Sequence, residues 1–249
     1  ISTKDKIQDA FQGVDQQSLF KPITKKTWTI TKTKKIPEIF SKAFNLAMLP
    51  RRGPVQLNLP RNILSETAKF NFKKSKKSYE TINTTKGGRG AIEKAAKIIS
   101  SAIKPVIIVG GGIKYTGNYK EVTKLAELIN IPIVTAAGHG DAIPFDHKLN
   151  VGQMGPRGNP VASRLMKETD VIIAFGTRLG FNSTFFSYEN LNKKAKIIQI
   201  ELENKMLGRY FPISVGICAD ASTVAKQLCN KIKINKLSKE IDNWTRKYL

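Results

Sequence analysis

The feature that most constrains this sequence is a series of short, β-branched apolar runs that alternate with amphipathic helical patterns after Gly90. The runs expected as strands are 105–109, 131–134, 171–175, 197–200 and 213–217. Apolar residues at helical spacing cover 92–99, 120–128, 161–167 and 221–231. Strands that are apolar throughout are buried on both faces, which is typical of a parallel sheet with helical crossovers. Right-handed crossovers then predict an α/β fold over residues 90–233, with a doubly wound, Rossmann-like parallel sheet.

The region before Gly90 has a different organisation. Pro37 opens a helical pattern that ends at Pro50, and residues 55–59 alternate as a strand; residues 28–31 form a second candidate strand. These patterns predict that residues 1–64 are the tail of another α/β domain. Residues 65–89 are rich in Lys, Ser and Thr and end in glycines, so we expect a linker there. The chain starts at Ile1 in mid-pattern, so we expect it to be an excerpt of a longer protein. Residues 234–249 are accordingly expected to be a short helix or a linker to a further domain.

The net charge first suggests a nucleic-acid-binding protein, since 42 Lys and Arg oppose 19 Asp and Glu, a balance of +23. The basic residues, however, run along the whole chain. The two denser clusters, 25–35 and 73–77, are not interleaved with aromatics as a base-stacking platform requires. Lysine also far exceeds arginine, the residue that forms forked contacts with phosphates and bases. We therefore predict solvated basic faces and no nucleic-acid partner, with nucleic-acid binding kept as a rival that salt-dependent binding would test.

Membrane and secreted classes have no support in the sequence. No apolar run approaches the roughly 18 residues that a membrane span needs. Residues 1–9 are polar and charged, unlike a signal peptide. Cys218 and Cys229 are the two cysteines of the chain, and packing explains both. These observations predict a cytoplasmic protein without a membrane partner.

Glycines and charged residues follow several of the expected strands. Gly110-Gly111-Gly112 comes directly after 105–109, although Tyr115 occupies the third glycine position of the dinucleotide fingerprint, so a plain tight turn explains it equally well. Segments 138–141, 154–158 and 176–178 also contain glycines with a charged residue and lie at comparable positions, and Glu201 ends an expected strand. Carboxyl ends of parallel strands meet at one edge, where ligands bind. Together these segments predict a nucleotide-shaped site or the relic of one.

Other chemistries find little support. His139 and His147 lie eight residues apart without Cys, Asp or Glu at metal-ligand spacing, so we expect no metal site in this chain. No serine lies in a Gly-x-Ser-x-Gly elbow. A nucleotide-binding module without catalysis remains a rival class, which thermal shifts with FAD, ADP and NAD would test.

Several segments resemble the thiamine-diphosphate-dependent enzymes. Residues 11–16 (FQGVDQ), 22–25 and 52–61 (RGPVQLNLPR) are similar to the end of the family's pyrimidine-binding domain. Four more are similar to its central domain in order and spacing: KPVIIVGGG (104–112), IPIVTAAGHGDAIPFDH (131–147), ETDVIIAFGTRL (168–179) and AKIIQIELE (195–203). The resemblance covers nearly the whole chain.

Two branches of the family compete. The acetolactate synthases carry an Asp-Asp-Arg run after the central Gly-x-Arg, whereas here Gly176-Thr177-Arg178 is followed by Leu179-Gly180-Phe181. This stretch, the loop around His139 and residues 215–217 resemble the sulfoacetaldehyde acetyltransferases more. The resemblance thus implies a transferase that converts sulfoacetaldehyde and phosphate to acetyl phosphate and sulfite, with acetolactate synthase as the alternative.

The resemblance also implies cofactors, partners and site residues. Thiamine diphosphate and Mg²⁺ would serve the full-length enzyme, and the activating glutamate and the Gly-Asp-Gly motif that binds magnesium would lie outside this chain. Small anionic substrates and a homodimer or homotetramer are implied in the same way. Accessory residues on the substrate side would be Phe11, Gln12 and Lys25.

In flavin-containing members, FAD contacts correspond here to Arg51, Gly110, Gly111, Gly112, Thr135, Ala136, Gly155, Arg157, Gly176, Arg178, Glu201 and Asp220. Pro156 and Gly180 depart from that flavin pattern. The resemblance therefore implies a vestigial nucleotide edge, with FAD or ADP as the alternative occupants, and Arg157 and Arg178 as candidates to attract a sulfonate or a phosphate.

Overall fold

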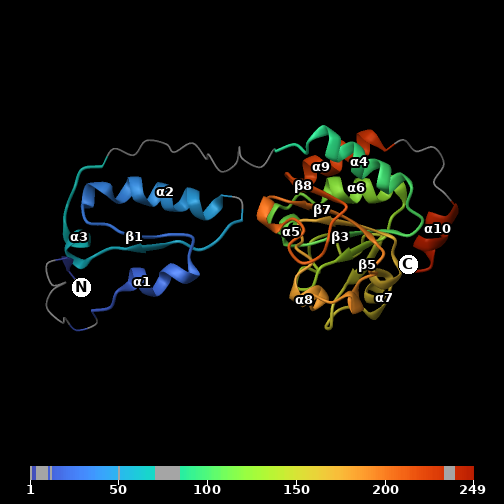
Figure 1. The fold of residues 1–249 in the computed structure, drawn as a ribbon. Coiled ribbons are helices and arrows are strands. Elements are labelled where there is room, and N and C mark those ends of the chain that lie inside the picture. Colours follow the sequence, from blue (N-terminus) through green and yellow to red (C-terminus); the bar gives the residue numbers. More distant parts are fainter. Residues whose placement is uncertain (1, 4–10, 12, 50, 71–84, 233–238) are drawn as a thin grey trace. The chain divides into compact units, whose positions relative to one another are not determined.

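The chain forms two compact units, Ile1–Asn83 and Thr84–Leu249 (Figure 1). The computed structural model describes residues 2–3, 11, 13–49, 51–70, 85–232 and 239–249. In this part of the chain, no helix is long and apolar enough to cross a membrane. Each unit is described by itself below.

The first unit is a small α/β arrangement around two short parallel strands. Strands β1 (Thr27–Thr29) and β2 (Gln56–Asn58) pair in register from Thr27 opposite Gln56 to Thr29 opposite Asn58. Helix α2 (Ile36–Met48) connects them, with Pro37 in its first turn, where a missing N–H does no harm. Two shorter helices, α1 (Gln16–Phe20) and α3 (Arg61–Ser65), flank the pair in sequence.

The second unit is built on one sheet of six parallel strands. They are β3 (Pro105–Val109), β4 (Ile133–Thr135), β5 (Asn150–Gln153), β6 (Val171–Phe175), β7 (Lys196–Glu201) and β8 (Val215–Cys218). The spatial order β5-β4-β3-β6-β7-β8 runs outward in both directions from the neighbours β3 and β6. This order is that of the Rossmann fold, and the crevice where it reverses is where ligands bind in such sheets. The predicted fold class is confirmed.

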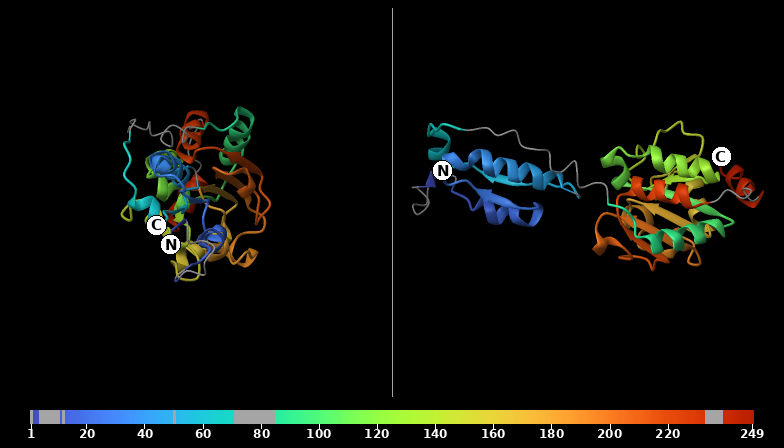
Figure 2. Two further views of the ribbon diagram at one scale, coloured as in Figure 1. Left: turned by 90° about the vertical axis from the view of Figure 1, so that its left-hand side faces the viewer. Right: turned by 90° about the horizontal axis from the view of Figure 1, so that it is seen from above.

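Helices cover both faces of this sheet (Figure 1). Helices α4 (Arg89–Ser100), α6 (Lys120–Ile129) and α9 (Ala221–Lys231) form one layer, which the right-hand view of Figure 2 shows from above with α9 between the other two. Helices α7 (Pro160–Glu168) and α8 (Phe181–Thr184) lie on the opposite face. The second unit has two hydrophobic cores. Because side chains alternate along a strand, Ile107 and Val109 lie in the first core, with the buried residues of α4, α6 and α9, and Val106 and Ile108 lie in the second, with those of α7.

Three elements of this unit were not expected from the sequence. Strand β5 is a polar edge strand of sequence NVGQ, and its register with β4 shifts near Gly152, whose φ is +104°. Helix α5 (Gly111–Thr116) begins inside the glycine run, where a turn was expected, and α8 is a single turn after β6. Strand β8 begins two residues later than predicted.

The C-terminal segment belongs to this unit. Helix α10 (Lys239–Arg246) places Trp244, which is 5% exposed, in the second core. The indole N–H donates to the carbonyl of Pro105 at 2.9 Å, and the Thr245 hydroxyl donates to the carbonyl of Asn130 at 2.6 Å. The sequence predicted a short helix or a linker leading away; the structure has a helix that docks on the sheet through a buried tryptophan.

Candidate functional site

Eleven of the twelve residues predicted to form a nucleotide edge lie at the carboxyl ends of the parallel strands of the second unit. The twelfth, Arg51, belongs to the first unit. Each strand is followed or ended by one or more of the eleven. In strand order these are Gly110, Gly111 and Gly112 after β3, Thr135 and Ala136 at β4, Gly155 and Arg157 after β5, Gly176 and Arg178 after β6, Glu201 at β7 and Asp220 after β8. Since all six strands are parallel, these residues share one edge of the sheet, which we call the carboxyl edge.

The glycine run makes a close contact between two loops at the point where the strand order reverses. The Gly110 N–H donates to the carbonyl of Phe175 at 3.0 Å, and the Gly112 N–H to that of Gly176 at 2.9 Å. A Cβ on Gly112 would lie 2.7 Å from the Gly176 Cα, and Gly176 itself has a φ of +59°. Loop packing therefore explains Gly110, Gly112 and Gly176, and two of the backbone N–H groups that could have cradled a phosphate are already used.

Gly111 instead makes room for the His139 ring, since a Cβ there would lie 2.9 Å from its Cε1 atom. The half-buried imidazole packs edge-on against Tyr115, with ring centroids 6.2 Å apart. Burial, followed by the nearby positive charges of Lys114 and Arg178, lowers the pKa of His139, while Asp141 acts in the opposite sense. The Lys114 ammonium lies 3.0 Å from the Asp141 carboxylate, which lowers the pKa of that carboxyl. His139 is therefore a neutral imidazole in a positive environment at neutral pH.

Two buried polar atoms at the carboxyl edge, Nδ1 of His139 and Oγ1 of Thr135, have no hydrogen-bond partner among the described residues. Thr135 is the last residue of β4 and is almost fully buried. Native proteins pair nearly all such atoms, and those left over mark places where a ligand or an ordered water completes the structure. Both atoms lie within five residues of sequence on the loop that leaves β4.

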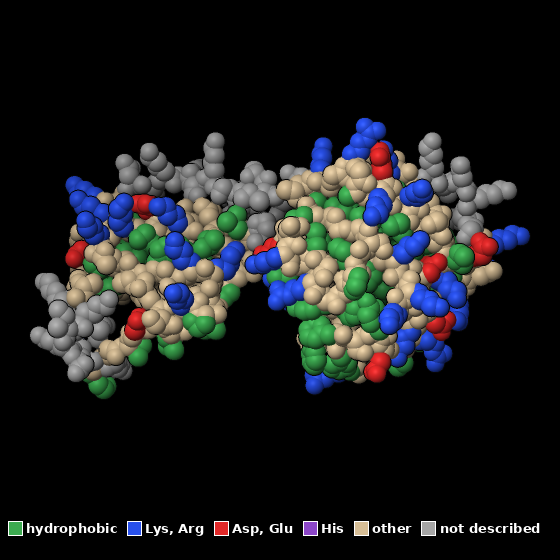
Figure 3. All heavy atoms as spheres, in the orientation of Figure 1, with side chains coloured by type: hydrophobic (Ala, Val, Ile, Leu, Met, Phe, Trp, Pro, Cys, Tyr) green, Lys and Arg blue, Asp and Glu red, His purple; other side chains and the backbone are tan. Residues whose placement is uncertain are grey.

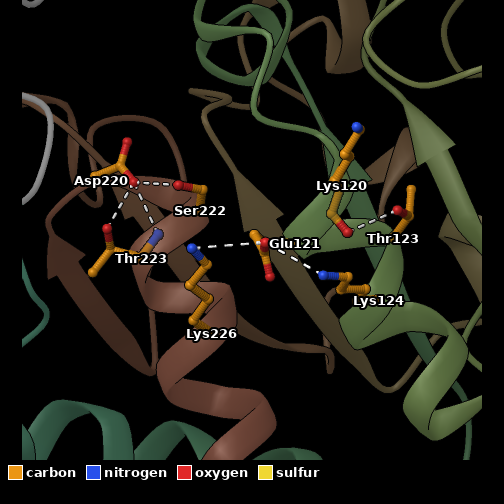
Figure 4. Close-up of polar contacts among 8 residues, drawn as sticks. All are labelled: Lys120, Glu121, Thr123, Lys124, Asp220, Ser222, Thr223 and Lys226. Atoms are coloured by element: carbon orange, nitrogen blue, oxygen red, sulfur yellow. Dashed lines mark hydrogen bonds and ion pairs between the residues drawn. The ribbon is translucent and has the colours of Figure 1, made fainter. Parts of the chain in front are cut away.

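Asp220 serves as the N-terminal cap of α9 (Figure 4). Its side chain is 2% exposed, and Oδ1 accepts hydrogen bonds from the Thr223 N–H at 2.8 Å, the Thr223 hydroxyl at 3.0 Å and the Ser222 hydroxyl at 2.6 Å. Beside it, Glu121 forms ion pairs with Lys124 on its own helix and with Lys226 of α9. The carboxylate predicted to contact a cofactor is thus engaged in holding a helix.

The remaining predicted residues of this edge are more open. Arg157 and Arg178 are exposed, and Gly155 has a φ of +101° in the loop after β5. Glu201 is half-buried at the end of β7, and its carbonyl accepts from the Ala219 N–H at 3.0 Å. The two arginines can meet an incoming anion directly.

The residues predicted on the substrate side belong to the first unit. Phe11 is 89% exposed, and Gln12 lies outside the described residues. The Lys25 ammonium donates to the carbonyls of Leu46 at 2.6 Å, Arg51 at 3.1 Å and Leu49 at 3.4 Å. Lys25 therefore binds carbonyls at the C-terminal end of α2 and just beyond it, where a positive charge is stabilising. Arg51 lies in this segment after α2 and has a φ of +47°.

The family of this chain is decided by a match of residues 92–228, more than half of the chain, to the model of the thiamine pyrophosphate enzyme central domain. The chain belongs to the thiamine pyrophosphate enzymes. The matched residues run from the start of α4 to α9, so they contain the whole six-stranded sheet and its carboxyl edge.

Relatives from two branches of this family are similar over nearly the whole chain. A probable acetolactate synthase large subunit of Methanococcus aeolicus is 36% identical over 245 residues, covering 96% of this chain and 41% of the relative. An acetolactate synthase large subunit of Buchnera aphidicola is 35% identical, covering 95% and 42%. A sulfoacetaldehyde acetyltransferase of Castellaniella defragrans is 32% identical, covering 92% and 38%.

These identities correct one prediction. The motifs placed the acetyltransferases nearer than the acetolactate synthases, whereas overall identity is slightly higher for the synthases. The disagreement has a simple origin, because the motif comparison rested on a few loop segments and identity averages over every strand and helix. The chain spans about two fifths of the length of these relatives.

Thiamine pyrophosphate enzymes use thiamine diphosphate and Mg²⁺ in their full-length form. The described residues of this chain contain no group of three or more His, Cys, Asp or Glu side chains that could hold a metal ion. They do not fit the magnesium and diphosphate group, so no chemical step through it is derived from them. The carboxyl edge of this central domain is instead suited to binding a polar or anionic group.

Sequence reasoning missed three residues that shape this edge: Lys114, Tyr115 and Asp141. Tyr115 was noted only as a departure from the glycine fingerprint, and Asp141 only as part of a loop. The signal was their position, since each follows the carboxyl end of an expected strand by a few residues. Their mutual contact, which joins the β3 and β4 loops, depends on the strand order and is not visible in the sequence.

Proposed function

We propose that the full-length protein is a thiamine-diphosphate-dependent acyltransferase that converts sulfoacetaldehyde and phosphate to acetyl phosphate and sulfite. The observation that carries this proposal is the segment after Arg178. Where the acetolactate synthases have Asp-Asp-Arg, this chain has Gly180-Phe181-Asn182, which begins α8 without a carboxylate.

The electrostatics of the carboxyl edge support anionic substrates. Burial is the main cause of the lowered pKa of His139; the positive charges of Lys114 and Arg178 lower it further, and Asp141 raises it. Asp141 is paired with Lys114, which leaves Arg178 as the exposed cation of the β6 loop. An arginine fork suits both a sulfonate and a phosphate, because its donors match two oxygens at once.

Acetolactate synthase activity is the second candidate, and the overall identities favour it. In that case pyruvate alone would be the substrate, and its product would be acetolactate. FAD or ADP at the carboxyl edge would then be an occupant to consider, although Gly110, Gly112 and Asp220 are already engaged in loop packing and helix capping.

The deciding experiment is an assay of the full-length protein supplied with thiamine diphosphate and Mg²⁺. Release of sulfite with formation of acetyl phosphate would support the first candidate, and acetolactate from pyruvate the second. If neither acetyl phosphate nor acetolactate forms, both candidate functions are refuted.

A matched pair of variants tests the role of the edge. Arg178→Ala is expected to raise the KM for phosphate or for the sulfonate several-fold with a smaller change in kcat, and Arg157→Ala to act in the same direction. Arg164→Ala, an exposed arginine on α7, is the control and should leave both constants unchanged. Unchanged KM values for both anions in Arg178→Ala and Arg157→Ala would refute this role.

A further inference from the structure

Gln199 is a buried polar side chain in the middle of an otherwise apolar strand. It lies in β7 between Ile197, Ile198 and Ile200, which are all almost fully buried, and it is itself only 2% exposed. Because side chains alternate along a strand, Gln199 points to the same face of the sheet as Ile197, which belongs to the second core. An amide buried in this way needs hydrogen-bond partners within the protein, since leaving it unpaired is unfavourable.

The Gln199 amide joins two loops of the carboxyl edge. Its Nε2 atom donates to the Thr177 carbonyl at 3.1 Å, in the loop after β6, and its Oε1 atom accepts from the Gly208 N–H at 2.8 Å, in the loop after β7. Each of these two loop residues comes directly before an exposed arginine, Arg178 and Arg209. The Thr177 carbonyl belongs to the same planar peptide group as the Arg178 nitrogen, so the first hydrogen bond orients the backbone of Arg178 directly.

The loop after β6 is held from other directions as well. The Gly176 carbonyl accepts from the Gly112 N–H at 2.9 Å, which ties this loop to the glycine run after β3. The Thr177 hydroxyl accepts from the Leu179 N–H at 3.3 Å. Arg178 therefore extends from a backbone that is fixed on both sides, and its guanidinium is placed by rotation of its own side chain.

The place of Arg178 matters more than its charge. Lys and Arg side chains are spread over the visible face of the second unit (Figure 3), so positive charge alone does not distinguish this residue. Arg178 instead lies where the strand order reverses, which is where ligands bind in such sheets. Burial and the charge of Lys114, and then that of Arg178, lower the pKa of His139, so the guanidinium lies near enough to act on the imidazole. A guanidinium binds two oxygens of an anion at once only when its donors are aimed at them.

We propose that Gln199 is a positioning residue, which holds the peptide group before Arg178 so that the Arg178 guanidinium meets the sulfonate or phosphate group of a substrate. The proposal rests on the part that Arg178 has in the proposed function. Gln199 is too deeply buried to touch the substrate, so it acts through Arg178.

The variant Gln199→Met in the full-length protein removes both hydrogen bonds and keeps a side chain of similar length and volume. The KM for sulfoacetaldehyde and the KM for phosphate are measured separately, to show which anion Arg178 binds. Gln199→Met should raise several-fold the same KM that Arg178→Ala raises, with a smaller change in kcat. Gln199→Asn is one methylene shorter and reaches one loop at a time, so it should act in the same direction more weakly. It serves as the test if the methionine variant does not fold, which circular dichroism shows.

Asn192→Leu is the matched control. The Asn192 amide makes the same pair of backbone hydrogen bonds at the amino edge of the sheet, where it donates to the Thr169 carbonyl at 2.8 Å and accepts from the Lys194 N–H at 3.0 Å. Its replacement should lower the stability of the protein and leave both KM values unchanged. A rise in KM in Asn192→Leu equal to that in Gln199→Met would show a general loss of stability and would overturn the proposal.

Two readouts separate positioning from a merely structural role. NMR titration of the histidine-labelled full-length protein should show that Gln199→Met raises the pKa of His139, as Arg178→Ala does, whereas Asn192→Leu does not. The double variant Gln199→Met, Arg178→Ala should have the same KM values and the same His139 pKa as Arg178→Ala alone. An unchanged His139 pKa in Gln199→Met, or effects that add in the double variant, would overturn the proposal. The titration needs no turnover, so it tests the placement of Arg178 even if the proposed function is refuted.

Discussion

The two edges of the central sheet differ in the hydrogen bonds and the backbone conformation of the loops that meet there. At the amino edge, the Asp170 carboxylate accepts from the N–H groups of Ile103 at 2.8 Å and Lys104 at 2.9 Å, and the Thr169 hydroxyl donates to the Lys104 carbonyl. At the carboxyl edge, Thr135 Oγ1 and His139 Nδ1 have no partner in the part of the chain that the structure describes.

Backbone conformation follows the same division. Among the described residues, five other than glycine have a positive φ, and three of them, Leu179, Phe185 and Phe186, lie in the loop after the carboxyl end of β6. The amino edge adds a docked helix with its tryptophan instead. An unpartnered buried atom also occurs beside Trp244, at the Tyr248 hydroxyl, so unpaired groups alone do not separate the two edges. The difference is in the backbone, whose strained residues gather in the segment after β6, where a ligand or a partner can relieve the strain.

The largest expected effect is at the amino edge. Trp244→Ala removes a buried ring that packs against Tyr248 and an indole hydrogen bond, so the free energy of unfolding should fall by about 3–5 kcal/mol. Trp244→Phe keeps most of the packing and should lose much less. Urea unfolding followed by circular dichroism measures both. A loss under about 1 kcal/mol in Trp244→Ala would mean that α10 contributes little to the stability of this edge.

A smaller effect is expected where the two loops of the carboxyl edge touch. Gly112→Ala forces a Cβ against the Gly176 backbone, and the free energy of unfolding should fall by about 1–3 kcal/mol. Gly90→Ala, at the start of α4, meets nothing within 4 Å and should stabilise the chain by up to about 1 kcal/mol. The same unfolding experiment compares them. Equal stabilities of the two variants would contradict the close contact between Gly112 and the Gly176 backbone.

The smallest effect concerns His139. Its folded pKa lies below the ordinary value of 6.5, so the unfolded chain binds more protons as the pH falls through 6.5. The stability is therefore complete above pH 6.5 and declines as the pH falls from there to the folded pKa. Titration of the imidazole signals by NMR should show the low pKa, and Arg178→Ala should raise it.

Two variants act as checks on this titration. His139→Gln should lose the low-titrating signal and flatten the decline in stability below pH 6.5. His147→Gln removes the second histidine of the chain and should leave that signal in place. A His139 pKa at or above 6.5 would contradict the positive, desolvated environment described for the carboxyl edge.

The sheet was largely predictable from the sequence, and the reasons are local. Residues 105–109 and 171–175 are apolar at every position, because both faces of a central parallel strand are covered. Strand β5 escaped prediction because an edge strand of sequence NVGQ lacks both continuous apolar character and alternation. Trp244 gave no local signal either, since its partner Pro105 is 139 residues away in sequence.

The candidate site was predictable in position but not in the role of each residue. Strand ends placed Gly110, Gly176 and Asp220 at one edge. The sequence around Asp220 also matches a helix N-cap, with Ser222 and Thr223 behind it, and the resemblance to a cofactor contact concealed that signal. Contacts across loops, such as that of Lys114 with Asp141, required the strand order.

The placement of the tryptophans has a practical consequence. Trp28 lies half-buried in β1 of the first unit, and Trp244 is buried in the second, and the chain has no others. Each unit thus carries one intrinsic fluorophore in a different solvent environment. Emission from Trp28→Phe would report on the second unit alone, and emission from Trp244→Phe on the first, so the two halves of the chain can be followed separately with no added label.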